Sequence, residues 1–138
     1  MSGRAAPLAR AGFRTFHPVP LRWADIDRYG HANNVAYLAW FDTAVNALYA
    51  ARGILSDEPR FVVAETGCAF HREVRFGEAI EVGVRPARIG RSSVAYDLAV
   101  FVEGEAEARA QGRYVHVLVG AAGPVAIDAR RRAVLEAM

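Results

Sequence analysis

One helical pattern followed by a long run of alternating strands limits the folds open to this chain more than any other feature. From Asn34 to about Arg52, apolar residues recur at spacings of three and four, which predicts an α-helix. Asn33 or Asn34 can cap its start, and Gly53 fits just past its end. The apolar stripe consists of Val35, Leu38, Phe41, Val45 and Leu48, and it is widened by Tyr37, Trp40, Ala44 and Tyr49. A helix that is apolar on nearly all sides is a buried helix.

Beyond Pro59 the apolar period changes to two, which is typical of strands. Alternating stretches cover 80–85 and 94–100, and Phe61–Val74 and Glu107–Val119 are also strand-like. The turns between them are marked by Gly77, Gly90 and Gly104. Connections this short indicate antiparallel pairing.

An earlier strand and a later helix complete the expected order. Phe16–Ala24 is compatible with an edge or irregular strand, because Pro18 and Pro20 lack the N–H of a central strand. Arg130–Ala137 predicts a short last helix. One buried helix against one antiparallel sheet is an α+β domain. We therefore expect a flexible N-terminal tail at residues 1–15 and a single domain at residues 16–138.

The segment from Arg113 to Val119 is apolar on both faces of the expected strand. Tyr114 and His116 alternate with Val115 and Val117. One helix covers only one face of a sheet, so the other face needs a cover of its own. A second subunit is the simplest candidate, which predicts a homodimer or homotetramer.

Composition narrows the classes of partner and compartment. All 17 basic residues are Arg, interleaved with acidic residues to a net charge of +2, which indicates a solvated surface rather than a nucleic-acid footprint. The single cysteine, Cys68, excludes an intramolecular disulfide and favours a reducing, cytoplasmic location. No apolar run approaches the roughly 20 residues of a membrane helix. His17, His71 and His116 show no metal-ligand spacing, so we expect neither a metal nor a cofactor.

The polar loop before the helix carries a specific motif. Residues 22–38 read RWADIDRYGHANNVAYL and meet every fixed position of Asp-x-Asp-x-x-Gly-His-x-Asn-Asn-x-x-Tyr. This run resembles the signature of the 4-hydroxybenzoyl-CoA thioesterase family, and 73–78, 88–94 and 112–117 are similar to that family as well. The resemblance covers roughly residues 17–120. It implies the hotdog fold, in which an antiparallel five-stranded sheet wraps around a long central helix.

The resemblance also implies a site and a reaction, hydrolysis of an acyl-coenzyme A to free acid and coenzyme A. Asp27 matches the catalytic aspartate, which acts as nucleophile or general base, and Asn34 matches the position whose backbone N–H polarises the thioester carbonyl. Coenzyme A would lie against Arg88, Arg91, Ser92 and Ser93. The chemistry is consistent, because an ionised Asp can attack or activate water and helix N-terminal N–H groups can hold an oxyanion.

Other polar residues of this region have competing roles. Asp25 is expected to be structural, whereas Asp42, on the buried helix, is the rival for the essential carboxylate and should have partners. His31 could hydrogen-bond the thioester carbonyl, help place water or anchor the loop. Asn33 fits a capping role, and Tyr37 the core or the pocket wall.

Two other functions remain open on the same fold. A hydratase or dehydratase would act on an acyl-CoA double bond, but such enzymes separate their Asp and His by four residues, and three separate Asp27 from His31 here. A non-catalytic acyl-CoA binding protein is the second alternative. The sequence does not identify the acyl group or distinguish coenzyme A from an acyl carrier protein.

Overall fold

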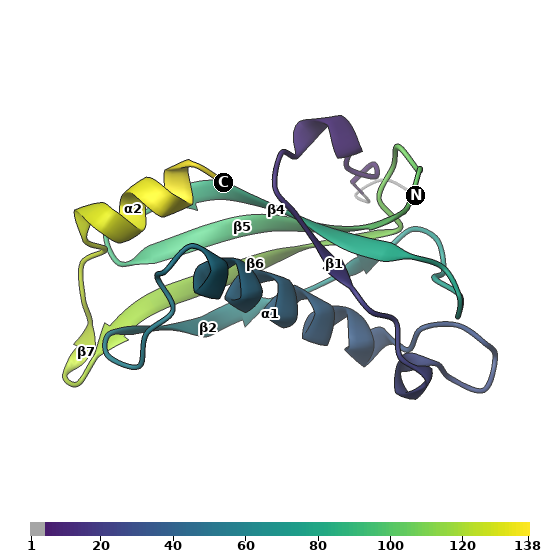
Figure 1. The fold of residues 1–138 in the computed structure, drawn as a ribbon, viewed down its shortest axis with the longest axis horizontal. Helices are drawn as coiled ribbons and strands as arrows, with labels where there is room; N and C mark the ends of the chain where they lie inside the picture. The colour runs from purple at the N-terminus through teal and green to yellow at the C-terminus, as the bar shows by residue number, and fades with distance from the viewer. Residues whose placement is uncertain (1–4) are drawn as a thin grey trace.

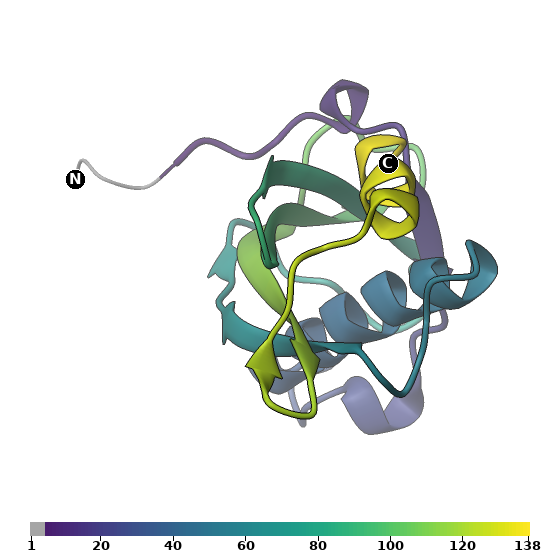
Figure 2. The same ribbon diagram turned by 90° about the vertical axis from the view of Figure 1, so that its left-hand side faces the viewer.

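The computed structural model of the protein describes residues 5–138, and its central element is helix α1 (Asn34–Ala51). The helix lies within the curve of an antiparallel sheet (Figures 1 and 2). The side chain of Asn33 accepts a hydrogen bond of 3.0 Å from the N–H of Ala36 and so caps the helix. Gly53, just past the end, has a φ of +75°. The predicted helix and its caps are confirmed.

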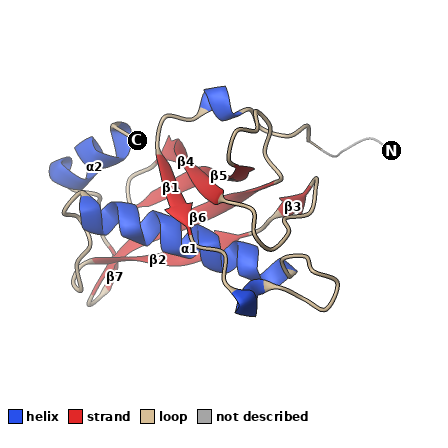
Figure 3. Ribbon diagram, turned by 45° about the vertical axis from the view of Figure 1, so that its right-hand side comes forward, coloured by secondary structure: helices blue, strands red, loops and turns tan. Residues whose placement is uncertain are grey.

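The sheet contains five long strands in the order β1-β4-β5-β6-β2 (Figure 3). Two short strands, β3 and β7, each pair with β6. The bounds are β1 Phe16–Val19, β2 Arg60–Thr66, β3 Ala69–Phe70, β4 Ile80–Ile89, β5 Ser93–Val102, β6 Ala110–Gly120 and β7 Gly123–Pro124. The predicted hotdog arrangement, a five-stranded antiparallel sheet around a long helix, is confirmed, with β3 and β7 as additions.

The main core lies between α1 and the inner face of the sheet. Every second residue of β4, β5 and β6 points at the helix, as Val84, Leu98 and Leu118 do with no exposed surface. Burying a side chain of this size contributes about 1.5–3 kcal/mol. Helix α2 (Ala129–Glu136) adds the buried Leu135 to the same core, and its position agrees with the predicted last helix.

The predicted strand over Phe16–Ala24 is too long. β1 ends at Val19, and a short 3-10 helix follows at Trp23–Asp25. Pro20 lacks an N–H group that could continue the ladder. The chain turns instead, and the Asp25 carboxylate accepts a hydrogen bond of 2.9 Å from the N–H of Arg22.

The expected strand over Phe61–Val74 is interrupted. It divides into β2 and β3 at Gly67, whose N–H donates to the carbonyl of Arg113 at 3.1 Å. A register shift between Val63 and Glu65 already bends β2 before this break. Apolar residues lie on both sides of Gly67, so the sequence indicated one continuous strand and did not reveal the break.

The predicted flexible tail at residues 1–15 is also too long; its residues 1–4 lie outside the described part of the chain. Phe13 is buried and contacts Phe101 edge to face, with ring centroids 5.6 Å apart. The carbonyl of Leu8 accepts a hydrogen bond of 2.9 Å from the N–H of Ala108. The strand expected from Glu107 begins at Ala110, and the segment before it pairs with the N-terminal residues through a bridge between Ala9 and Glu107. The N-terminal segment thus covers part of the outer sheet face, for which a second subunit was the expected cover.

Candidate active site

The loop between β1 and α1 is fixed by a buried carboxylate. Asp25 is 4% exposed, accepts the N–H of Arg22 and pairs with the Arg22 guanidinium at 2.8 Å. Burial alone would raise the pKa of Asp25, but the hydrogen bonds and charge of Arg22 hold it below its ordinary value. The carbonyl of Asp25 also accepts from Asn33 at 2.9 Å, which ties the loop to the helix cap. Asp25 therefore has structural contacts on all sides.

Asp27 is anchored through one carboxylate oxygen and leaves the other available. Its Oδ1 accepts hydrogen bonds from the N–H groups of Tyr29 at 2.8 Å and His31 at 3.2 Å. The loop can close this tightly because Gly30 has a φ of +81°, which glycine adopts without strain. Within residues 5–138, Oδ2 of Asp27 has no hydrogen-bond partner. A held carboxylate with one free oxygen is suited to attack a carbonyl or to accept a proton from water.

The start of α1 supplies hydrogen-bond donors beside this carboxylate. Asn33 satisfies the N–H of Ala36, whereas the N–H groups of Asn34 and Val35 find no acceptor in the described part of the chain. The first N–H groups of a helix lack intrahelical partners and lie at the positive end of its dipole. They can therefore stabilise an oxyanion.

A cavity of about 340 Å³ brings these groups together. It is lined by Asp27, His31, Ala32, Asn34, Tyr37, Phe70, His71, Arg72 and Glu73. Four of the predicted site residues, Asp27, His31, Asn34 and Tyr37, thus share one cavity. Sequence reasoning missed the wall at 70–73, because the pairing that brings this segment to the loop, a bridge between His31 and Arg75, connects distant parts of the chain.

Tyr37 belongs to both the core and the cavity wall. It is 2% exposed and packs against Phe70 with ring centroids 4.9 Å apart. Burial raises the pKa of Tyr37, so its hydroxyl is protonated at neutral pH. Nearby, burial raises the pKa of Cys68 to about 11, which keeps that thiol protonated and a poor nucleophile.

The predicted coenzyme A residues lie elsewhere in the same chain. Arg88, Arg91, Ser92 and Ser93 belong to the end of β4, the following turn and the start of β5, beside α2 (Figure 1). The loop with Asp27 lies at the opposite end of α1 (Figures 1 and 3). The 18 residues of this helix span about 27 Å. One chain alone therefore does not bring the two predicted groups together.

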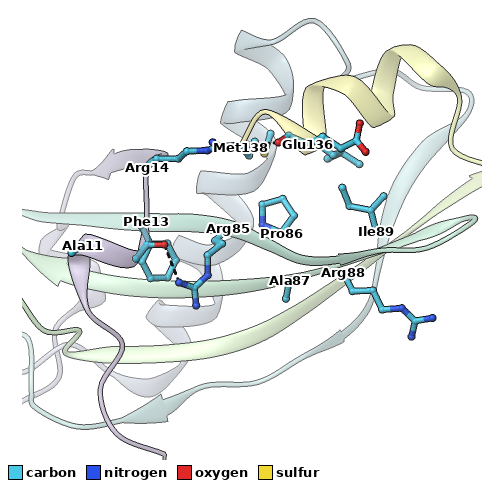
Figure 4. A pocket seen from close by; sticks show the side chains of 12 residues that line it. Ala11, Phe13, Arg14, Arg85, Pro86, Ala87, Arg88, Ile89, Glu136 and Met138 are labelled. Atoms are coloured by element: carbon cyan, nitrogen blue, oxygen red, sulfur yellow. Dashed lines mark hydrogen bonds between the residues drawn. The ribbon is translucent and has the colours of Figure 1, made fainter.

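A larger groove, of about 570 Å³, lies between the N-terminal segment, the end of β4 and α2 (Figure 4). Of the predicted site residues it includes only Arg88. Arg85 in this groove already donates to the carbonyl of Gly12 at 2.9 Å and pairs with Asp97 at 3.0 Å. The groove includes one carboxylate, that of Glu136, but none of the residues at the start of α1 that could hold an oxyanion.

Asp42, the rival carboxylate, does not lie on the buried side of α1 as expected. It is exposed in this chain, and its carboxylate accepts a hydrogen bond of 2.5 Å from the hydroxyl of Tyr114. The partner that was expected for Asp42 is therefore present. The helix turns its apolar side to the sheet, which leaves this position outside.

A buried polar network joins α1 to strands β5 and β6. The hydroxyl of Tyr49 hydrogen-bonds the hydroxyl of Tyr96 at 2.7 Å and Nδ1 of His116 at 2.8 Å. His116 is 1% exposed, and burial lowers its pKa to about 4. It is therefore a neutral residue of the core at physiological pH.

We predict that acid destabilises the fold through His116. An unfolded imidazole titrates near 6.5, so between pH 6.5 and 4 the unfolded chain binds a proton that the folded chain does not. The contribution of His116 to the free energy of unfolding is thus complete above pH 6.5 and is lost as the pH falls toward 4. At pH 5 the loss is about 2 kcal/mol. Urea unfolding at pH 7 and pH 5 measures it. His116→Gln should lose about 2 kcal/mol less than the wild type over this interval, and equal losses would contradict the assignment.

Comparison with known proteins identifies the family. Residues 29–109 match the model of the thioesterase superfamily. The chain belongs to this superfamily. The PA5185 protein from Pseudomonas aeruginosa strain PAO1 is 45% identical over 96% of both chains, and its crystal structure superposes with a TM-score of 0.90. The expected hotdog fold is thereby confirmed.

Two more distant relatives give further context. A thioesterase from Thermus thermophilus, crystallised with coenzyme A and Zn, is 30% identical to the present chain. The match covers 91% of this chain and 94% of that chain, and the TM-score is 0.77. The uncharacterised protein YsmA of Bacillus subtilis strain 168 is 27% identical over 99 residues, which are 70% of this chain and 67% of YsmA.

Membrane spans and metal clusters are both absent from the described part of the chain. In residues 5–138, no helix is long and apolar enough to cross a membrane. Over the same range, no group of three or more His, Cys, Asp or Glu side chains is arranged to hold a metal ion.

Proposed function

We propose that this member of the thioesterase superfamily hydrolyses acyl-coenzyme A. Water adds its oxygen to the thioester carbonyl carbon, the carbon–sulfur bond breaks, and the products are the free acid and coenzyme A. Asp27 acts as nucleophile or general base, and the helix N–H groups of Asn34 and Val35 stabilise the oxyanion. The observation that carries this proposal is the meeting of a half-free carboxylate and unpaired N–H donors at one cavity.

The substrate class rests on the relatives and on the arginines. The Thermus thermophilus relative was crystallised with coenzyme A. In this chain the turn between β4 and β5 carries Arg88 and Arg91, and the planar guanidinium fork of Arg suits phosphate oxygens. With Ser92 and Ser93 these side chains form the proposed coenzyme A site. The resemblance to the 4-hydroxybenzoyl-CoA thioesterases makes aromatic acyl groups the first to test. The single free cysteine, Cys68, is consistent with a reducing compartment, and we propose that the protein acts in the cytoplasm.

A screen of short, long and aromatic acyl groups tests this proposal, with release of free thiol as the readout. Each acyl group is offered on coenzyme A and on acyl carrier protein. Thiol release from at least one coenzyme A thioester, and faster than from its carrier-protein counterpart, is the expected result. Absence of thiol with every substrate would reject the activity.

We predict that the protein is a homodimer or a dimer of dimers with sites at the subunit interface. In this chain Val35 and Leu38 of α1 and Val63 of β2 are exposed. β2 also ends the sheet, so its outer edge is unpaired within residues 5–138. A second copy could cover these residues and bring its β4–β5 turn to the Asp27 loop. Light scattering at micromolar concentration should give twice or four times the mass of the chain, whereas the mass of a single chain would contradict the prediction.

A further inference from the structure

The wall of the candidate active site contains a carboxylate–imidazole pair. Oε2 of Glu73 lies 3.0 Å from Nε2 of His31, and both residues line the 340 Å³ cavity with Asp27. The nearest guanidinium nitrogen of Arg75 lies 4.0 Å from the same Oε2. The Glu73 carboxylate thus lies between an imidazole and a guanidinium at the edge of the cavity.

The backbone holds this pair in place independently of the two side chains. The N–H of Ala32 donates to the carbonyl of Val74 at 2.8 Å, within the bridge between His31 and Arg75. The carbonyl of Glu73 accepts from the guanidinium of Arg109, which is almost fully buried. Arg109 is in turn held by two carboxylates, those of Glu78 at 3.0 Å and Glu105 at 2.6 Å.

The pair biases which nitrogen of His31 carries the proton. The negative charge of the Glu73 carboxylate, 3.0 Å from Nε2, favours a proton on that nitrogen over Nδ1. In the neutral imidazole the other nitrogen, Nδ1, then carries a lone pair. Within residues 5–138, Nδ1 of His31 has no partner. A lone pair cannot donate to a thioester carbonyl, but it can accept a hydrogen bond from water.

We propose that Glu73 is a positioning residue, which fixes His31 in the tautomer that orients the attacking water through Nδ1. This inference rests on the proposed thioesterase function and chooses among the histidine roles left open by the sequence. The carbonyl is polarised by the helix N–H groups, and His31 holds the water beside Asp27. No proton leaves His31 in this role.

Kinetics of a double-mutant cycle test the coupling between the two side chains. Glu73→Gln can both donate and accept, so it no longer selects one tautomer. It should lower kcat about tenfold, the contribution of roughly one hydrogen bond, with KM changed less than about twofold. In the His31→Ala background the same change should have no further effect, because Glu73 acts only through His31. If the kcat reductions of the two single variants multiply in the double variant, the proposal is overturned. A raised KM in place of a lowered kcat would overturn it as well.

A second measurement needs no substrate. Nitrogen-15 NMR of labelled histidine, recorded at a pH where the imidazole is neutral, should show His31 protonated at Nε2 alone in the wild type and a mixture of tautomers in Glu73→Gln. Protonation at Nδ1 in the wild type would refute the pairing. Glu103→Gln, an exposed glutamate of the β5–β6 turn, is the matched control and should retain wild-type kcat and wild-type spectra. If the wild type releases no thiol, the proposed function fails, and the NMR result still decides the pairing.

Discussion

Replacing Asp27 by Asn is expected to lower thioester hydrolysis by about a thousandfold, which corresponds to about 4 kcal/mol of activation free energy. Asn keeps the size of the side chain, and its amide oxygen can still accept the N–H groups of Tyr29 and His31. The substitution therefore preserves the loop and removes only the charge at the free oxygen. Because an uncharged amide is a poor nucleophile and a poor base, the chemical step should be lost.

Two measurements separate this loss from other effects. Calorimetric titration should show that Asp27→Asn binds intact acyl-CoA within a few-fold of the wild type, since the substrate gains little from this charge before reaction. Asp57→Asn, an exposed aspartate of the loop before β2, is the control and should have wild-type turnover. Asp25→Asn should reduce folding and activity together, because the buried Asp25 carboxylate loses its ion pair with Arg22. Normal thiol release by a well-folded Asp27→Asn variant would exclude Asp27 as the catalytic carboxylate.

A single methyl group on Gly112 is expected to destabilise the fold by about 3 kcal/mol or more. A Cβ atom at Gly112 would lie 1.9 Å from the backbone oxygen of Gly67 and 3.0 Å from a ring carbon of Phe41. The first contact is with backbone, which cannot rotate away as a side chain can. β6 must therefore move away from the break between β2 and β3.

The neighbouring glycine provides a matched control for this prediction. A Cβ at Gly67 would meet no atom within 4 Å. Thermal unfolding should therefore show Gly112→Ala about 10 °C below the wild type, while Gly67→Ala stays near it. Equal melting temperatures for Gly112→Ala and the wild type would show that the strands do not approach this closely.

The local periodicity of apolar residues was sufficient to predict much of the fold. The stripe through Val35, Leu38 and Phe41 predicted α1, and alternation predicted the long strands, because both periods follow from backbone geometry. It failed where the backbone leaves a regular path. The break at Gly67 and the early end of β1 after Val19 depend on contacts with distant segments, which leave no local period.

The candidate site divides in the same way. Asp27, His31, Asn34 and Tyr37 lie within eleven consecutive residues, so the sequence could name them together. Glu73 reaches them through the bridge between His31 and Arg75, and the resemblance over 73–78 did not indicate that contact. Asp42 shows the limit most clearly, because it was expected to be buried with its helix and proved exposed.

The products formed from an unsaturated acyl-CoA test the proposed reaction most directly. Mass spectrometry of the reaction mixture distinguishes cleavage of the thioester from addition of water to the double bond. Hydrolysis through Asp27 predicts free acid and free coenzyme A in equal amounts with the wild type, and about a thousandfold slower formation of both with Asp27→Asn. An intact thioester that has gained one water, with no free coenzyme A, would contradict hydrolysis and identify a hydratase instead.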